Sequence, residues 1–450
     1  MSVARSFSLG RFTTELGVDL PGAHLSYRTH GTLDRDGTNC VLLPSYYTGT
    51  HRSYEPWIGP GRMFDPRDWF VVAVDMFGNG LSSSPSNHPL PRTFPLLTIA
   101  DNVRAQRALL DSLGVRGIAL AAGWSMGALQ CYEWAVRYPS MVRSLLPICG
   151  AARCSDFNRV FLDGVASTLT ADPAYRSGTG PPVDGLRAFG RVYAGWAYSR
   201  DFFDRGSYRD VGYDSIDDLL DGWANDHAAM DADDLTAMLD TWRTADVGRG
   251  HAGGFDAALG SIGARTIVMP GTTDAYFTLA DAAREAALVP GAELRPIDSE
   301  LGHIAGAPES GRPRPTRSPP PRGNCWPIPR SRTRRRRQSS EADDAARVVL
   351  RQLPHTVLGD EGHDALGCGL TVECHDDGRR DRAVTEVGDA GDLRRRLVDL
   401  RRLDHAVDQL RIGLRALDQR DLLRRGDRLV EGARQVRVQF GGCRRGDQLR

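Results

Sequence analysis

The stretch Gly117–Pro139, GIALAAGWSMGALQCYEWAVRYP, decides the fold. Its first six residues form an apolar run of the length of a buried strand, and the residues after Ser125 are typical of a helix that ends before the proline. Between them, Gly123 and Gly127 flank Ser125 in the pattern G-x-S-x-G. There a sharp turn exposes the serine hydroxyl above a sheet, and small neighbours let the backbone bend back on itself. This context predicts that Ser125 is a nucleophile; a structural turn is the alternative.

Short apolar runs alternate with amphipathic ones on both sides of this turn. The predicted strands are Cys40–Pro44, Trp69–Asp75, Gly117–Ala122, Arg143–Cys149, Arg265–Met269 and Glu293–Ile297. The predicted helices are Leu97–Leu113, Met126–Tyr138 and Leu279–Leu288. Strands that alternate with helices indicate a parallel sheet covered on both faces. The strand rhythm stops between residues 150 and 260, so we predict an inserted helical cap there.

A serine hydroxyl is a weak nucleophile without a base, which is usually a histidine oriented by a carboxylate. In the α/β-hydrolase fold the three residues follow in the order Ser, then Asp or Glu, then His. Asp274 and His303 each follow one of the two last predicted strands. We therefore predict an α/β-hydrolase fold with Ser125, Asp274 and His303 as its catalytic triad. Asp298 is the alternative acid. The alternative bases, none of which follows a late strand, are His51, His88, His227 and His251.

The negative charge that develops on a substrate carbonyl needs two backbone N–H donors. One is expected from Met126, the residue after the nucleophile. The other is expected from the loop SYYTG after the first predicted parallel strand, at Tyr47. For Tyr47 a simple packing role is the alternative.

The chain of 450 residues has two parts of different composition. Residues 1–307 hold 26 Arg against 35 acidic residues, and residues 308–450 hold 31 Arg against 22, so their net charges are −9 and +9. Only Trp326 and Phe440, of 34 aromatic residues, lie beyond residue 307. A region with so few large apolar side chains cannot offset the chain entropy that folding costs. We predict a folded enzyme over 1–307, a Pro/Arg-rich linker over 308–340 and a disordered or non-homologous Arg-rich tail over 341–450. A frameshift in GC-rich DNA would produce such a tail; a genuine appended region is the alternative.

The sequence also bears on location and partners. No run approaches the ~20 apolar residues of a membrane helix, and the N-terminus lacks an apolar signal segment. We expect a cytoplasmic protein without a membrane partner.

The eight Cys, without CxxC spacing, predict reduced thiols, and we expect no metal site and no bound cofactor. The Arg-rich tail leaves nucleic-acid or acidic-surface binding as an alternative function, which its interspersed acids and few aromatic residues disfavour.

Several segments together resemble the homoserine O-acetyltransferases and their relatives. They are TGTHRSYEPWIGPGRMFDPRDWFVVAVDMFGNG (48–80), GWSMGALQCYEWAVRYPSMVRS (123–144), DPAYRSGTGPPVDGL (172–186), DVGRG (246–250) and PGAELRPIDSELGH (290–303). The resemblance implies acyl transfer through an acyl-serine, from an acyl-CoA as co-substrate to an alcohol, and often a homodimer.

The resemblance also suggests how substrate is bound. The family's alcohol pocket includes an Arg and, seven residues later, a Tyr of the cap, which Arg191 and Tyr198 match; a surface Arg and a packing Tyr are the alternative. In the homoserine enzymes the catalytic His is followed by an Asp that is expected to hold the substrate ammonium, whereas Ile304 follows His303 here. We therefore predict a small-molecule acyl donor and an alcohol acceptor other than homoserine. An esterase with the same triad and water as acceptor is the second interpretation, and a catalytically inactive relative a further one.

Overall fold

The structure, a computed structural model, describes residues 4–89, 93–308, 370–376, 379–385 and 436–440. The chain divides into two units, Met1–His355 and Thr356–Arg450. The first unit contains the predicted α/β-hydrolase fold, with a parallel sheet and helices on its faces, which confirms the fold class.

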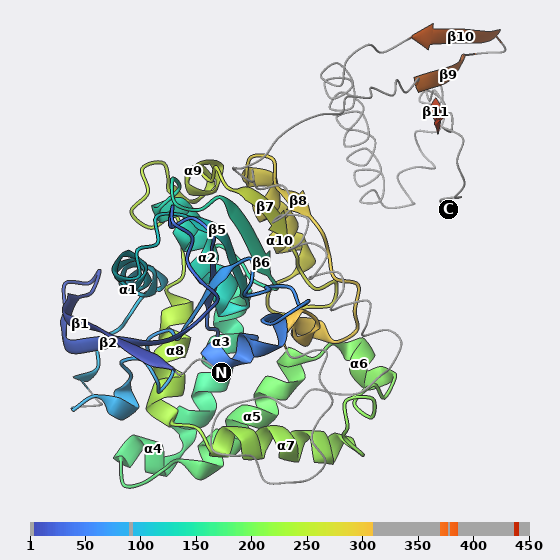
Figure 1. Cartoon of the computed structure of the whole chain (residues 1–450). Helices are drawn as coiled ribbons and strands as arrows, with labels where there is room; N and C mark the ends of the chain where they lie inside the picture. The colour runs from blue at the N-terminus through green and yellow to red at the C-terminus, as the bar shows by residue number, and fades with distance from the viewer. Residues whose placement is uncertain (1–3, 90–92, 309–369, 377–378, 386–435, 441–450) are drawn as a thin grey trace. The chain divides into compact units, whose positions relative to one another are not determined.

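An eight-stranded sheet forms the centre of the first unit (Figure 1). Its strands are β1 Arg5–Thr13, β2 Asp19–His30, β3 Cys40–Pro44, β4 Phe70–Val74, β5 Ile118–Trp124, β6 Ser144–Ile148, β7 Arg265–Val268 and β8 Glu293–Leu294. They lie in the order β1-β2-β4-β3-β5-β6-β7-β8. Strands β3 to β8 pair in parallel, and β2 pairs antiparallel with both β1 and β4. The six predicted strands thus form the parallel part of the sheet.

Strands β3, β4, β5 and β6 are buried along their whole length. Continuous apolar runs such as CVLLP and FVVAV suit this position because helices cover both faces of a parallel sheet. The N-terminal hairpin of β1 and β2 was not predicted. Its strands mix buried and exposed residues, and β1 contains irregularities between Ser8 and Phe12. Such an edge hairpin lacks the apolar run by which the inner strands are recognised.

Ten α-helices accompany these strands within the described part of the first unit. They are α1 Ile99–Ser112, α2 Met126–Arg137, α3 Asp156–Ala171, α4 Pro173–Ser177, α5 Val183–Ala197, α6 Arg200–Asp204, α7 Ile216–Ala228, α8 Ala232–Arg243, α9 Gly254–Gly260 and α10 Leu279–Leu288. Two 3₁₀ helices matter for the site, η1 His51–Trp57 and η4 Gly302–Gly306. Helices α3 to α9 lie where the cap was predicted, between β6 and β7.

Figure 1 shows α4, α5 and α7 grouped at one end of the first unit, away from α9 and α10. One hydrophobic cluster continues from the sheet into this cap, with Leu146 and Ile148 of β6 together with Leu186, Trp223 and Leu239 of cap helices. A second cluster lies between the sheet, α1, α2 and the N-terminal hairpin. Because the cap shares its core with the sheet, the ends of β5 and β6 are enclosed between the two.

In the second unit the described residues are three strands, β9 Leu370–Asp376, β10 Arg379–Thr385 and β11 Val436–Phe440. They pair antiparallel in the order β10-β9-β11 and were not predicted. The predicted linker 308–340, apart from Pro308, and most of the predicted tail lie outside the described residues. Most of the tail residues on which the alternative of nucleic-acid or acidic-surface binding depends therefore lie outside the described residues too.

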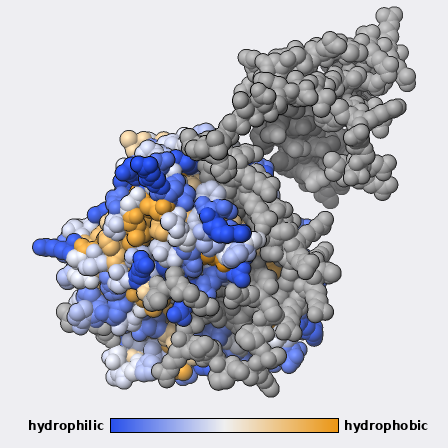
Figure 2. All heavy atoms as spheres, in the orientation of Figure 1, coloured by the Kyte–Doolittle hydropathy of each residue, from blue (hydrophilic) through white to orange (hydrophobic). Residues whose placement is uncertain are grey.

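The surface of the first unit is largely hydrophilic on the face in Figure 2, with small hydrophobic areas between the polar ones. The exposed large hydrophobic residues include Phe157 and Val160 of α3 and Val192 of α5. Within the described residues, no helix combines the length and the hydropathy needed to cross a membrane.

Candidate active site

Ser125 lies on a strained turn between β5 and α2. Its φ of 57° and ψ of −128° belong to a region that residues other than glycine rarely adopt. The two motif glycines make the turn possible: a Cβ on Gly123 would lie 2.4 Å from the backbone of Gly127, and a Cβ on Gly127 would lie 2.6 Å from the carbonyl oxygen of Pro44. The turn therefore requires the residue types that the motif supplies.

Asp274 and His303 form a buried pair. Nδ1 of His303 lies 2.7 Å from Oδ2 of Asp274, and His303 and Asp274 are 2% and 6% exposed. Oδ1 of Asp274 accepts the amides of Tyr276 at 3.0 Å and Phe277 at 3.1 Å. Two backbone donors thus hold Oδ1 of the carboxylate in place, and Oδ2 orients the imidazole. Within the part of the chain that the structure describes, Nε2 of His303 has no hydrogen-bond partner.

Short contacts join the loops that carry these residues. The hydroxyl of Thr273, beside Asp274, donates to the carbonyl of Ser299 at 2.6 Å and accepts the amide of Gly302 at 3.1 Å. The indole N–H of Trp124, beside Ser125, donates to the carbonyl of His303 at 3.2 Å. These contacts fix the three loops relative to one another.

Ser125 and His303 line the same cavity, with Asp274 behind the imidazole. The structure thus brings together the three residues predicted as the triad. The Ser125 hydroxyl does not donate to Nε2 here; such a bond commonly tightens only in the complex with substrate.

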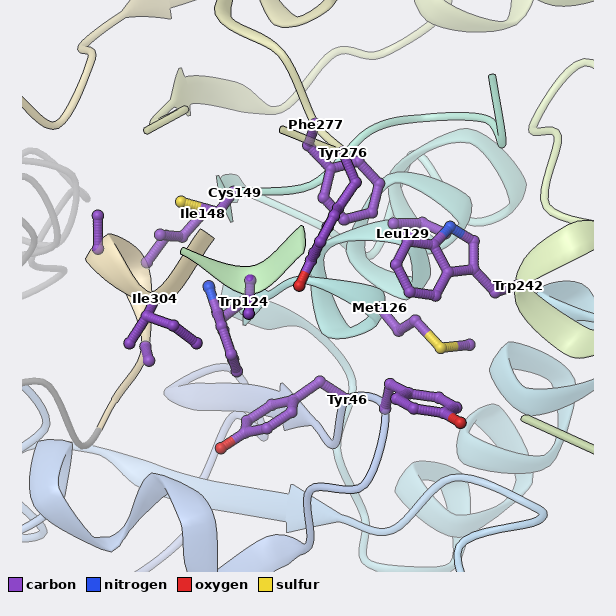
Figure 3. Packing of buried hydrophobic residues seen from close by; sticks show 14 of the residues in the cluster. Tyr46, Trp124, Met126, Leu129, Ile148, Cys149, Trp242, Tyr276, Phe277 and Ile304 are labelled. Carbon is purple, nitrogen blue, oxygen red and sulfur yellow. The ribbon is translucent and has the colours of Figure 1, made fainter. Parts of the chain in front are cut away.

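The cavity is small and mostly aromatic. Its volume is about 20 Å³, close to the space that one water molecule needs. It is lined by Tyr47, Thr48, Trp124, Ser125, Tyr193, Trp223, Tyr276, His303, Ile304 and Ala307. Figure 3 shows the ring of Tyr276 reaching toward Trp124 and Met126, with Ile304 on the other side of Trp124. Burial raises the pKa of the Tyr193 and Tyr276 phenols, so both stay neutral. Among the described residues that line this cavity, none is Asp, Glu or Arg.

The two predicted oxyanion donors lie in the loop after β3 and at the start of α2. Tyr47 lines the cavity, and Met126 is the first residue of α2, directly after Ser125. Among the described hydrogen bonds, neither amide donates to a protein acceptor. Thr48, the next residue after Tyr47, has a φ of 60°, which turns the loop sharply at this point. Both N–H groups are thus available to an anionic oxygen.

The structure does not bring Arg191 to this cavity. Its side chain, on the outer face of α5, is 44% exposed and pairs with Asp221. Tyr198 is buried at the C-terminal end of α5. Its ring stacks on that of Phe202, with centroids 4.0 Å apart, and it does not line the cavity. The predicted substrate-binding role of Arg191 therefore has no support in this placement, and Tyr198 occupies a packing position.

The rival acid Asp298 and the four rival bases lie apart from the cavity. Asp298 is exposed, and His51 pairs with Asp75 at 2.6 Å. The three further histidines, His88, His227 and His251, are not among the lining residues. Within the described residues, no group of three or more His, Cys, Asp or Glu could hold a metal ion.

Besides Trp124 in the G-x-S-x-G motif, three aromatic lining residues were not predicted from the sequence. Tyr193 and Trp223 come from cap helices α5 and α7, and Tyr276 follows Asp274 in its loop. Of these three, only Tyr276 could have been suspected from the sequence, because it follows the predicted acid by two residues. Nothing in the sequence of the cap says which of its many aromatic residues faces the nucleophile.

Comparison with known proteins agrees with this geometry. A family model described as alpha/beta hydrolase fold matches residues 41–305. The ethyl acetate hydrolase of Pseudomonas veronii is 36% identical over 307 residues, which cover 66% of this chain and 88% of that protein. The homoserine O-acetyltransferase of Thermobifida fusca is 32% identical over 325 residues, which cover 64% and 86%.

Among solved structures, an acetylester hydrolase from Corynebacterium glutamicum matches with a TM-score of 0.69 and 31% identity. The match covers 78% of this chain and 96% of that one. The names of these relatives denote ester hydrolysis or acyl transfer, and this chain is an enzyme of that type. The chain therefore belongs to the α/β-hydrolase family, in the group that contains the homoserine O-acetyltransferases and the esterases similar to them.

Proposed function

We propose that this chain is a serine esterase that hydrolyses small uncharged esters through an acyl-serine on Ser125. One observation carries the proposal: Ser125 and the buried His303–Asp274 pair meet at a cavity of about 20 Å³, and none of the described residues that line it is Asp, Glu or Arg. So little space disfavours a long acyl chain, and the neutral aromatic wall favours an uncharged substrate.

The chemistry follows from the placement of the proposed triad. Nε2 of His303 takes the proton of Ser125 as Oγ attacks the ester carbonyl, and Asp274 holds the imidazolium that forms. The amides of Tyr47 and Met126 stabilise the oxyanion. The C–O bond to the alcohol then breaks, and Nε2 returns its proton to the leaving oxygen. Water, deprotonated by the same nitrogen, attacks the acyl-serine. The bond between the acyl carbon and Oγ of Ser125 then breaks, Nε2 returns the proton to Oγ, and the acid is released.

Water is favoured over homoserine as the acceptor because of the lining. Homoserine carries an ammonium group, and a desolvated ammonium needs a carboxylate partner. Ile304 stands where a carboxylate would be needed, and Arg191, which was predicted for the alcohol pocket, points outward to Asp221. The ethyl acetate hydrolase, with 36% identity, supports the same choice.

A direct test compares acceptors and donors with one enzyme. Acid release from ethyl acetate is followed in a pH-stat, and acetyl transfer to homoserine is measured with acetyl-CoA as donor. We expect acid release that disappears in Ser125→Ala, and little transfer. Faster acetylation of homoserine than hydrolysis of ethyl acetate would instead establish the acyltransferase that the 32% identical homoserine O-acetyltransferase suggests.

Acyl-CoA as a donor would apply to the transferase interpretation, and cytoplasmic location is still a prediction.

For the homodimer, we propose a contact through the apolar side chains of Phe157 and Val160 on α3, which are 49% and 62% exposed. Sedimentation of wild type and Val160→Asp checks this: a monomeric wild type would contradict it.

A further inference from the structure

Trp124 occupies an unusual position for a residue beside the nucleophile. It is 6% exposed and lines the cavity, yet its indole also touches the imidazole of His303, with ring centroids 4.7 Å apart and planes 27° from parallel. Its N–H donates to the carbonyl of the same His303. Behind it, the ring of Tyr46 meets the indole edge-on at 4.5 Å. The indole is thus fixed from two sides.

The contacts with His303 and Tyr46 make the indole of Trp124 a rigid part of the cavity wall. Figure 3 shows Trp124 with Tyr46, Tyr276 and Ile304 around it. Tyr46 is 1% exposed, and its ring packs so closely on Gly49 that a Cβ at that position would lie 2.5 Å from the ring. Close-packed interiors yield little to an added methylene group. A longer substrate chain on this side would have to displace the indole and the imidazole together.

We propose that Trp124 limits the size of the ester that reaches Ser125 and, through its contacts with His303, fixes the position of the imidazole. The proposal rests on the esterase function proposed above. It assigns Trp124 a specificity role, because the indole faces the cavity, and a positioning role, because the indole N–H holds the backbone of His303.

The test compares three substrates that differ by two methylene groups. Ethyl butanoate lengthens the acyl side of ethyl acetate, and butyl acetate lengthens the alcohol side. In Trp124→Ala the space of the indole opens. Each methylene that leaves water strengthens binding about fourfold. We therefore expect kcat/KM for at least one longer ester, relative to ethyl acetate, to rise about tenfold or more.

Trp124→Phe separates the two roles. The phenyl ring keeps part of the wall but cannot donate to His303, so we expect a lower kcat on ethyl acetate with little change in KM and a smaller shift in chain preference. Trp134→Phe is the matched control. Trp134 is fully buried on α2, its indole N–H donates to Gln106 at 2.7 Å, and it does not line the cavity. Its variant should leave kcat and chain preference unchanged.

Folding and nucleophile integrity are checked by the melting temperature and by labelling with a serine-directed phosphonate. If Trp124→Ala does not fold, Trp124→Leu replaces it, with the same expected direction. A folded, labelled variant in which neither longer ester gains on ethyl acetate overturns the proposal. A wild type that releases acid from none of the three esters is a different outcome, because it refutes the esterase function itself.

Discussion

Replacement of Asp274 by Asn tests how the carboxylate acts on His303. In the structure, Oδ2 lies 2.7 Å from Nδ1 of His303, and Oδ1 accepts the amides of Tyr276 and Phe277. An Asn side chain can keep its oxygen on the two amides. Its NH₂ group then faces Nδ1 and donates to it, so the imidazole carries its proton on Nε2.

The size of the effect follows from that tautomer. An imidazole protonated on Nε2 cannot accept the proton of Ser125, although every residue is still in place. In serine hydrolases with this arrangement the same exchange lowers kcat by ~10⁴-fold, which corresponds to about 5 kcal/mol of transition-state stabilisation. We expect a loss of this order here, with little change in KM for ethyl acetate.

Acid release in a pH-stat measures kcat and KM, and a melting curve shows that the variant is folded. The matched control is Asp298→Asn, because Asp298 also follows β8 near His303 but is exposed and does not line the cavity. We expect less than about a threefold change in that variant. A loss below about tenfold in Asp274→Asn, or a large loss in Asp298→Asn, would refute the assignment of the acid.

Three further predictions concern charge. Ile304→Asp places a carboxylate at the cavity, so the rate of acetyl transfer to homoserine relative to 4-hydroxybutyrate should rise about ten- to a hundredfold; a wild type that already prefers homoserine tenfold would contradict this. Burial raises the pKa of Glu285 to about 8. Between about pH 5 and 8 only the unfolded chain releases this proton, so wild-type stability should fall by up to ~4 kcal/mol relative to Glu285→Gln. Urea unfolding at several pH values measures this, and parallel curves would refute it. Arg191→Ala should change kcat/KM for ethyl acetate less than about threefold because its side chain faces Asp221; a tenfold loss would bring Arg191 back to the substrate.

Much of the architecture could be predicted from the sequence because its signals are local. The parallel strands are short apolar runs, and the helix Leu279–Leu288 begins after Thr278, whose side chain accepts the amide of Asp281. The order of Ser125, Asp274 and His303 along the chain is enough to predict that they meet, because all three follow parallel strands at the same edge of the sheet.

The substrate residues could not be predicted in the same way. Arg191 and Tyr198 were assigned because they match the Arg and Tyr, seven residues apart, in the alcohol pocket of the homoserine O-acetyltransferases. Arg191 lies on α5, and Tyr198 directly follows this helix. The face that meets the cavity instead carries Tyr193, two residues after Arg191. Which face of a cap helix turns inward depends on how the cap packs on the sheet, and a local pattern does not contain that information.

Covalent attachment of substrate to Ser125 is tested by labelling with a serine-directed phosphonate followed by peptide mass mapping. We expect one adduct per chain, on the peptide that contains Ser125, with loss of ethyl acetate hydrolysis in proportion to labelling. In Ser125→Ala, in which turnover falls by up to ~10⁶-fold, we expect neither adduct nor hydrolysis. An adduct on another serine, or hydrolysis that persists in Ser125→Ala, would show that Ser125 is not the nucleophile.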